Sequence, residues 1–254
     1  MLNIRAMIIN DDKFINKKGE SDRYILVADG EPNSLFYTSM LLRRFDYFVS
    51  MATTSGEAFE MIAVALPSLV IIAETIRDMS GLKFIEELRK NARTSDVPFI
   101  AMTRADNLLD IQRFSKLGAA DCLHLPLSAD DLYQAVQRTI ETTPRTHMRV
   151  RTFLPLKVNN ISLNCPEGVC TTDISELGMF VRMKDPYDAD TRLGLEIELE
   201  GRSVAIEAKV IYSYRTNDGP YHEPGMGLEF VKITPQDQGL IRRYIRDEIT
   251  SGNR

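Results

Sequence analysis

Two arginines, Arg145 and Arg149, stand four residues apart in a locally cationic stretch of an otherwise acidic chain. Between residues 142 and 168 the only acidic residue is Glu167, whereas the whole chain of 254 residues has a formal net charge of −5. A guanidinium group offers a planar fork of N–H donors that pairs bidentately with phosphate and also stacks on a purine face. The pair is therefore suited to an anionic ligand.

A second polar group follows 24 residues after Arg149, where Asp173, Ser175 and Gly178 form an Asp-x-Ser-x-x-Gly pattern. The carboxylate accepts hydrogen bonds from N–H donors, the hydroxyl both donates and accepts, and the glycine permits a turn and a close approach of ligand to backbone. These residue types are also favoured in an ordinary β-turn, which is the alternative interpretation. That alternative leaves the arginine-rich segment unexplained. Arg151, two residues beyond the pair, could assist.

The arginine spacing alone is not specific, because it also occurs at Arg89/Arg93 and Arg242/Arg246, both in predicted helices. The Asp-x-Ser-x-x-Gly pattern occurs once. In this order and separation the two motifs resemble those of PilZ domains, which bind cyclic di-GMP, and the resemblance covers about residues 143–250. It implies that cyclic di-GMP is the ligand and that Arg145, Arg149, Asp173, Ser175 and Gly178 bind it. Many PilZ domains carry a doubled arginine at the first position, but Pro144 stands there.

The second predicted domain spans residues 151–254, and from Phe153 on it shows the alternating pattern that is typical of strands with one buried face. In residues 203–214 we expect Tyr212 and Tyr214 on the same face as the aliphatic residues that precede them. A helix should begin at Thr234, with the threonine as N-cap and Pro235 in the first turn. Six strands are predicted, at residues 154–163, 168–175, 178–183, 192–200, 203–214 and 225–233. The expected fold is a six-stranded antiparallel barrel with a C-terminal helix, preceded by a linker at residues 143–150.

Residues 24–142 alternate short apolar runs with amphipathic stretches in five strand–helix repeats. This pattern predicts a doubly wound α/β domain, with a parallel sheet covered by helices on both faces. Ser128, followed three residues later by Asp131, predicts the start of the last helix.

This region, residues 23–142, resembles the flavodoxin-like receiver domain of two-component response regulators, which takes phosphate onto an aspartate. The matching stretches are "ILVADGEP", "SGEAFEMI", "PSLVIIAETIRDMSGL", "VPFIAMT" and "GAADCLHLPL". That family has five functional positions. Asp29 stands at the first magnesium-binding acid and Thr103 at the threonine position, as in the family. Gly30 replaces the second acid, Ala73 the acceptor aspartate and Leu125 the lysine. A carboxylate nucleophile, oxygen ligands for Mg²⁺ and a cation are what this chemistry needs. We therefore expect a degenerate receiver that is not phosphorylated and binds magnesium weakly if at all.

Two other acidic features do not restore this chemistry. Glu74 follows Ala73 directly, but one step along a strand points a side chain to the opposite face. The acids at residues 11–12 lie about 61 residues before Ala73, whereas Asp29 lies 44 before it, so they do not replace the missing acid. Residues 1–22 are assigned to an N-terminal extension.

Composition excludes several classes of protein. The chain has no apolar run near the length of a membrane span, and its acidic balance does not favour a nucleic-acid partner. Three cysteines without metal spacing, Cys122, Cys165 and Cys170, suit a reducing cytoplasm, and we favour free thiols over a Cys165–Cys170 pair across a hairpin. No catalytic constellation or metal cluster is present, so the prediction is a protein that is not an enzyme and has no cofactor or metal.

The two resemblances together predict a bacterial, cytoplasmic cyclic di-GMP effector. The receiver-like half would serve protein interaction or homodimerisation, for which receivers commonly use the region that corresponds to residues 107–142. Motility, secretion or surface polysaccharide machinery are the partners that the resemblance implies. The alternative is an adaptor whose PilZ barrel binds protein and no nucleotide.

Overall fold

The computed structural model describes residues 24–104, 107–162, 171–215 and 224–251. The chain divides into two compact units, Met1–Pro144 and Arg145–Arg254. The boundary between the units lies just before the first arginine of the pair.

The first unit is built on a five-stranded parallel sheet with the strand order β2-β1-β3-β6-β7. This is the strand order of flavodoxin-like domains, so the predicted doubly wound α/β fold is confirmed. The central strand is buried along its whole length, which explains its continuous apolar sequence. The strands are β1 (Tyr24–Ala28), β2 (Phe48–Ala52), β3 (Leu69–Ala73), β6 (Phe99–Arg104) and β7 (Asp121–Leu125).

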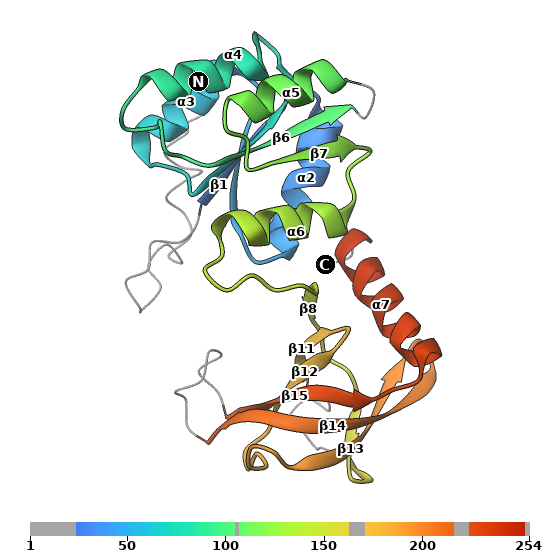
Figure 1. Cartoon of the computed structure of the whole chain (residues 1–254). Helices are drawn as coiled ribbons and strands as arrows, with labels where there is room; N and C mark the ends of the chain where they lie inside the picture. Colours follow the sequence, from blue (N-terminus) through green and yellow to red (C-terminus); the bar gives the residue numbers. More distant parts are fainter. Residues whose placement is uncertain (1–23, 105–106, 163–170, 216–223, 252–254) are drawn as a thin grey trace, which may run out of the picture. The chain divides into compact units, whose positions relative to one another are not determined.

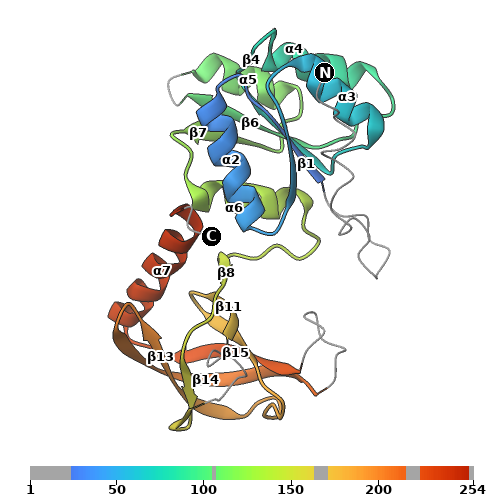
Figure 2. The same ribbon diagram turned by 180° about the vertical axis from the view of Figure 1, so that it is seen from behind.

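Five helices cover the two faces of this sheet (Figures 1 and 2). Buried residues of α3, α4 and α5 pack in one apolar cluster with the sheet, while α2 and α6 lie on the other face, where Phe45 and Tyr133 make an edge-to-face ring contact. Ser128 accepts a hydrogen bond from the backbone N–H of Asp131, as its position predicts. The helices are α2 (Pro32–Arg44), α3 (Ser55–Val64), α4 (Gly81–Lys90), α5 (Leu108–Lys116) and α6 (Ala129–Ile140), and a small hairpin, β4 (Thr75–Ile76) and β5 (Met79–Ser80), precedes α4.

The second unit contains one antiparallel sheet of eight strands rather than the six predicted, in the order β10-β9-β13-β14-β15-β12-β11-β8. Among the described residues no pairing joins the edge strands β10 and β8, so the sheet is curled and open, and the closed barrel is not confirmed. The strands are β8 (Arg149–Arg151), β9 (Leu156–Val158), β10 (Ile161–Ser162), β11 (Thr171–Ser175), β12 (Gly178–Arg182), β13 (Arg192–Leu199), β14 (Arg202–Tyr214) and β15 (Gly225–Lys232).

Two local causes explain the additional strands. The segment predicted as one strand at residues 154–163 is a hairpin, because Asn159 and Asn160 both have positive φ, 49° and 65°, as a two-residue turn of the mirror-image type requires. The other strand, β8, begins at Arg149, inside the predicted linker. It is too short for its alternation to be read from sequence.

A register shift in β14 also corrects the predicted orientation of its last residues. Val210 pairs with Leu228, but Tyr212 pairs with Gly227, so the strand contains a β-bulge between Val210 and Tyr212. An extra residue in one strand turns all following side chains to the opposite face. Tyr212 and Tyr214 therefore do not share the face of the buried aliphatic residues Val204, Ile206, Ala208 and Val210.

The C-terminal helix α7 (Pro235–Thr250) begins as predicted, because the Thr234 side chain accepts a hydrogen bond from the backbone N–H of Asp237 and Pro235 occupies the first turn. Its buried residues, Leu240, Ile241, Ile245 and Ile249, form an apolar stripe. The stripe packs toward β8, β11 and β13. Tyr244, half-buried, shares a short hydrogen bond with the hydroxyl of Thr152.

Some sequence-based expectations concern residues outside the described ranges. They include the acidic pair at residues 11–12, the N-terminal extension at 1–22, and the pairing of Cys165 with Cys170. Cys122 is a free, partly buried thiol. Within the described residues, no helix has both the length and the apolar character needed to cross a bilayer, and no cluster of three potential metal-ligating side chains occurs there.

Candidate ligand-binding site

The arginine motif and the acidic motif lie on neighbouring strands of the second unit. In the antiparallel pair of β8 and β11, Arg149 is opposite Ser175, and Arg151 is opposite Asp173. Directly opposed residues point to the same face, with Cβ atoms about 5 Å apart. The sheet therefore brings together side chains that are 26 and 22 residues apart in the sequence (175 − 149 and 173 − 151).

Exposure differs between the two motifs. Arg145, Arg149 and Arg151 are exposed, whereas Asp173 and Ser175 are each only 8% exposed. The arginines are thus accessible from solvent, whereas the carboxylate and the hydroxyl lie close to the sheet. This is an arrangement in which arginines can reach around a ligand while the acid and hydroxyl meet its inner edge.

The Tyr212 ring lies within electrostatic reach of this group. Burial raises the pKa of the Tyr212 phenol above its ordinary value, and the positive charges of Arg149 and Arg145 oppose that shift. The negative charge of Asp173 reinforces it. Arg145 stands before β8 in no regular element, yet its charge acts at the same place as that of Arg149.

Ser175 and Gly178 close the tight connection between β11 and β12. The Ser175 hydroxyl donates to the backbone carbonyl of Gly178 at 3.0 Å, and its lone pairs can still accept. A Cβ atom on Gly178 would lie 2.2 Å from the carbonyl oxygen of Leu228 on β15. The close approach of the neighbouring strand β15 therefore explains why a glycine stands at this position. The sequence had suggested a different explanation, a turn or the approach of a ligand.

Glu176, inside the acidic motif, is a residue that the sequence reasoning missed. Arg242 of α7 donates two hydrogen bonds to its carboxylate, one of them at 3.0 Å from Nε, and His147 Nδ1 lies 3.6 Å from Oε2. The hydrogen bond from Arg242 is the main reason that the pKa of Glu176 is lowered. Because His147 lies between Arg145 and Arg149, Glu176 links the arginine segment to α7. The only signal in the sequence was that Glu176 and His147 each lie inside a motif.

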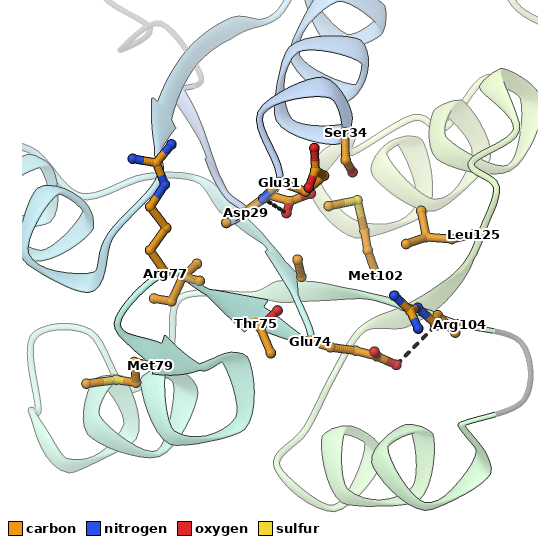
Figure 3. Close-up of a pocket in the computed structure, with 13 residues that line it drawn as sticks. Asp29, Glu31, Ser34, Glu74, Thr75, Arg77, Met79, Met102, Arg104 and Leu125 are labelled. Carbon is orange, nitrogen blue, oxygen red and sulfur yellow. Dashed lines mark hydrogen bonds between the residues drawn. The ribbon is translucent and has the colours of Figure 1, made fainter.

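The first unit contains a cavity of about 640 Å³ at the carboxyl ends of its parallel strands (Figure 3). Asp29, Gly30, Ala73 and Leu125 line it, so the structure brings together four of the five degenerate positions. Thr103 is fully buried at the end of β6, and its hydroxyl has no hydrogen-bond partner within the described part of the chain.

Side chains around this cavity are held by internal contacts. The Asp29 carboxylate accepts a hydrogen bond from the Glu31 backbone N–H at 2.9 Å. Glu74 points toward Arg104 (Figure 3), and its carboxylate accepts a hydrogen bond from the Arg104 backbone N–H at 3.0 Å. It also accepts a hydrogen bond from Asn107 Nδ2 at 2.9 Å. The Glu74 carboxylate is thus engaged at the rim and is not presented as a nucleophile.

Gly30 lies under the small β4–β5 hairpin. Its backbone N–H donates to the carbonyl of Thr75 at 3.1 Å, and a Cβ atom at this position would lie 3.1 Å from the Arg77 nitrogen and 3.2 Å from the Ile76 carbonyl carbon. These contacts are tight for any side chain. A side chain in place of Gly30 would therefore require the backbone of the hairpin to shift by a few tenths of an ångström.

Family models match both units. A response regulator receiver domain matches residues 25–137, and a PilZ domain matches residues 143–247. The chain is thus a signalling protein composed of two domains. Its first half belongs to the receiver family and its second half to the PilZ family, which is the predicted architecture.

Among curated relatives, a probable cyclic di-GMP phosphodiesterase of Vibrio cholerae is 28% identical over 63% of this chain and 33% of its own length. A probable transcriptional regulator of Cyanidium caldarium is 28% identical over 50% of this chain and 51% of its own length. The chain thus spans a third and a half of the lengths of these two relatives. Protein PilH of Pseudomonas aeruginosa is 23% identical over 46% of this chain and 96% of its own length.

Solved structures similar to this chain include a putative response regulator from Chloroflexus aurantiacus, with 21% identity and a TM-score of 0.46 over 47% of this chain and 98% of that one. The receiver domain of NtrX from Brucella abortus has 23% identity and a TM-score of 0.44 over 47% of this chain and 99% of its own.

Proposed function

We propose that this protein is a cyclic di-GMP-binding signalling effector whose receiver domain is not phosphorylated and serves protein interaction or dimerisation. The observation that carries the proposal is the pairing of β8 with β11, which places Arg149 opposite Ser175 and beside Asp173 on one face of a PilZ domain. The PilZ assignment by itself suggests signalling through cyclic di-GMP.

The chemistry of the five residues suits that ligand. Cyclic di-GMP offers two phosphates and two guanines, and each guanine presents O6 and N7 acceptors and an N1/N2 donor edge. Arg145 and Arg149 can pair bidentately with phosphate or with O6 and N7, and Asp173 can accept from the donor edge. Ser175 adds a compact hydroxyl, and Gly178 keeps the short connection after Ser175 in place.

Calorimetry of the full chain with cyclic di-GMP tests this function. Changing Arg149 to Ala should weaken binding by about 30-fold, since an unpaired ligand charge costs about 2 kcal/mol. Arg93→Ala is the matched control, because Arg93 belongs to an arginine pair of the same spacing in the other unit and is exposed. Absence of heat at micromolar protein would refute the proposal and favour the alternative, an adaptor whose PilZ domain binds protein and no nucleotide.

The receiver part of the proposal has its own test. Neither an acceptor aspartate nor the lysine is present at the cavity, where Ala73 and Leu125 stand instead. Incubation with acetyl phosphate and Mg²⁺ should therefore add no phosphate mass to the chain. A stable phosphorylated species in the intact-mass spectrum would overturn this half of the proposal.

The partner surface proposed for the receiver is the region of α5, β7 and α6. Most of its apolar residues are core, since Phe114, Leu132 and Val136 are fully buried, whereas Leu108 and Leu109 are 66% and 67% exposed. Two adjacent exposed leucines at the start of α5 are therefore the residues to substitute first when a partner or dimer is tested.

A further inference from the structure

The bulge in β14 places an aromatic group on the same face as the proposed ligand-binding residues. Across four neighbouring strands, Asp173 pairs with Phe180, Phe180 with Gly227, and Gly227 with Tyr212. Side chains of one cross-strand row share a face. Strands are spaced about 4.8 Å apart, so Asp173 and Tyr212 stand at the two ends of a row of about 14 Å.

Glycines let the aromatic rings lie directly on the sheet. A Cβ atom on Gly227 would lie 2.3 Å from Cζ of Tyr212, and one on Gly225 would lie 2.6 Å from Cζ of Phe180. Each ring therefore occupies the space above a glycine of β15. The end of the Tyr212 ring thus lies close to the backbone of Gly227, and the residue remains partly exposed.

Neighbouring rings hold Tyr212 in this orientation. The rings of Phe180 and Tyr212 are stacked, with centroids 6.5 Å apart and an interplanar angle of 26°, and the Tyr214 ring lies 5.4 Å from that of Tyr212. Phe180 is buried, whereas Tyr212 and Tyr214 are half-buried. A ring that is already packed loses little conformational entropy when a ligand covers its exposed side.

The five motif residues offer no aromatic surface to a purine ligand. Guanidinium forks neutralise phosphates and a carboxylate recognises a donor edge, but a base also has two apolar faces that must leave water. The Tyr212 ring shares a face of the sheet with Arg149, because the cross-strand row that ends at Tyr212 passes through Asp173 on β11, the strand that pairs with β8. The charges of both arginines reach the ring. The partly exposed Tyr212 ring adds an aromatic surface to this group of charges.

We propose that Tyr212 stacks on one guanine of the bound ligand and determines the preference of the site for a purine dinucleotide. This inference rests on the proposed function. The positions of Gly225 and Gly227 are explained by the same role, since a side chain at either would displace a ring from the platform.

Calorimetry on the full chain with cyclic di-GMP provides the test. Tyr212→Leu should weaken binding by about 5- to 150-fold, which corresponds to the 1–3 kcal/mol that stacking of one base contributes. Tyr212→Phe keeps the ring and should retain wild-type affinity. Tyr37→Leu, the same change at a half-buried tyrosine of α2, is the matched control and should also bind as the wild type does.

A spectroscopic signature separates stacking from a structural role of the tyrosine. In the wild-type complex, the H8 proton resonance of one guanine should move upfield because it lies over an aromatic ring. The Phe variant should keep this shift, and the Leu variant should reduce it. An unshifted H8 resonance in the wild-type complex would overturn the inference without recourse to any variant.

The outcomes also distinguish failure of the stacking role from failure of the proposed function on which it rests. If the wild type binds cyclic di-GMP and Tyr212→Leu binds equally well, the stacking role is wrong and the proposed function stands. If the wild type releases no heat with cyclic di-GMP, the proposed function fails and the stacking role fails with it.

Discussion

Replacing Gly178 by Ala tests why a glycine stands at the end of the acidic motif. Gly178 pairs with Glu229 across β12 and β15, and the methyl group would lie 2.2 Å from the Leu228 carbonyl oxygen and 3.3 Å from its carbonyl carbon. Real Cβ atoms essentially never come within 3.0 Å of another heavy atom. Because the obstacle is backbone, no rotation of a side chain can relieve the contact.

The strands must therefore separate by about 1 Å at this position, which strains the ladder that continues through the pairs toward Arg182. Overpacking of this kind costs about 1–3 kcal/mol, and a backbone obstacle places the expected loss at the upper end of that range. For a unit of this size each kcal/mol lowers the melting temperature by about 4 °C, so we expect a fall of about 8–12 °C.

Differential scanning calorimetry of the full chain measures the fall, and hydrogen exchange on peptides from β12 and β15 should locate it. Gly194→Ala is the matched control, because Gly194 lies in β13 of the same sheet and a Cβ there meets nothing closer than Asn159 Oδ1 at 3.8 Å. If Gly178→Ala melted as the wild type does but bound ligand more weakly, the packing explanation would be wrong. The glycine would then serve ligand approach, as expected from sequence.

Two further predictions concern polar contacts. Glu176→Gln removes the ion pair with Arg242. Since the pKa of Glu176 is lowered in the folded state, the stability that this carboxylate contributes is present above the ordinary value of 4.5 and is lost as the pH falls through the lowered value. Urea titrations should therefore show the variant less stable than the wild type at pH 7, and this difference should shrink below pH 4.5. A constant difference across that range would contradict the ion-pair explanation. Thr54→Ala removes the capping box that Thr54 forms with Glu57 at the start of α3 and should cost about 1 kcal/mol in the same measurement, whereas an unchanged midpoint would show that the cap adds nothing.

Substituting the three missing receiver residues at Gly30, Ala73 and Leu125 should not be enough to restore phosphorylation. Ala73 and Leu125 line open space and can accept larger side chains, but a Cβ atom at Gly30 would meet backbone atoms of the β4–β5 hairpin at 3.1–3.2 Å. Arg77, in this hairpin, donates its backbone N–H to the carbonyl of Thr53 at 3.0 Å. An acid at Gly30 would thus require this hairpin to shift by a few tenths of an ångström, a constraint that the sequence does not reveal.

Much of the fold could be predicted because its signals are local. Strand–helix alternation, the burial of β3 and the cap residues Ser128 and Thr234 all depend on neighbours within a few positions, and the structure confirms them. The number of strands in the second unit could not be predicted, since β8 is only three residues long and its Arg-Val-Arg alternation is too short to be recognised in the sequence. Its pairing with β11 is what makes it a strand.

The candidate site also contains residues that could be proposed from the sequence and residues that could not. Residue types and order, together with the resemblance to PilZ motifs, were enough to propose Arg145, Arg149, Asp173, Ser175 and Gly178, because the chemistry of guanidinium, carboxylate and hydroxyl groups belongs to the side chains themselves. Tyr212 and Glu176 were not selected. A β-bulge turns Tyr212 to the face of Asp173, and Glu176 accepts a hydrogen bond from Arg242, which lies 66 residues away in the sequence.

The sequence by itself determined which groups can bind an anion and which receiver groups are missing, since identity and spacing are properties of the chain. Only the tertiary structure decided which of these groups meet. Strand register sets Arg149 against Ser175, a single extra residue turns Tyr212 toward Asp173, and contact with Leu228 excludes any side chain at Gly178. The physical reason is that register and close approach are set by pairing between strands distant in sequence, and one residue of shift exchanges the two faces of a sheet.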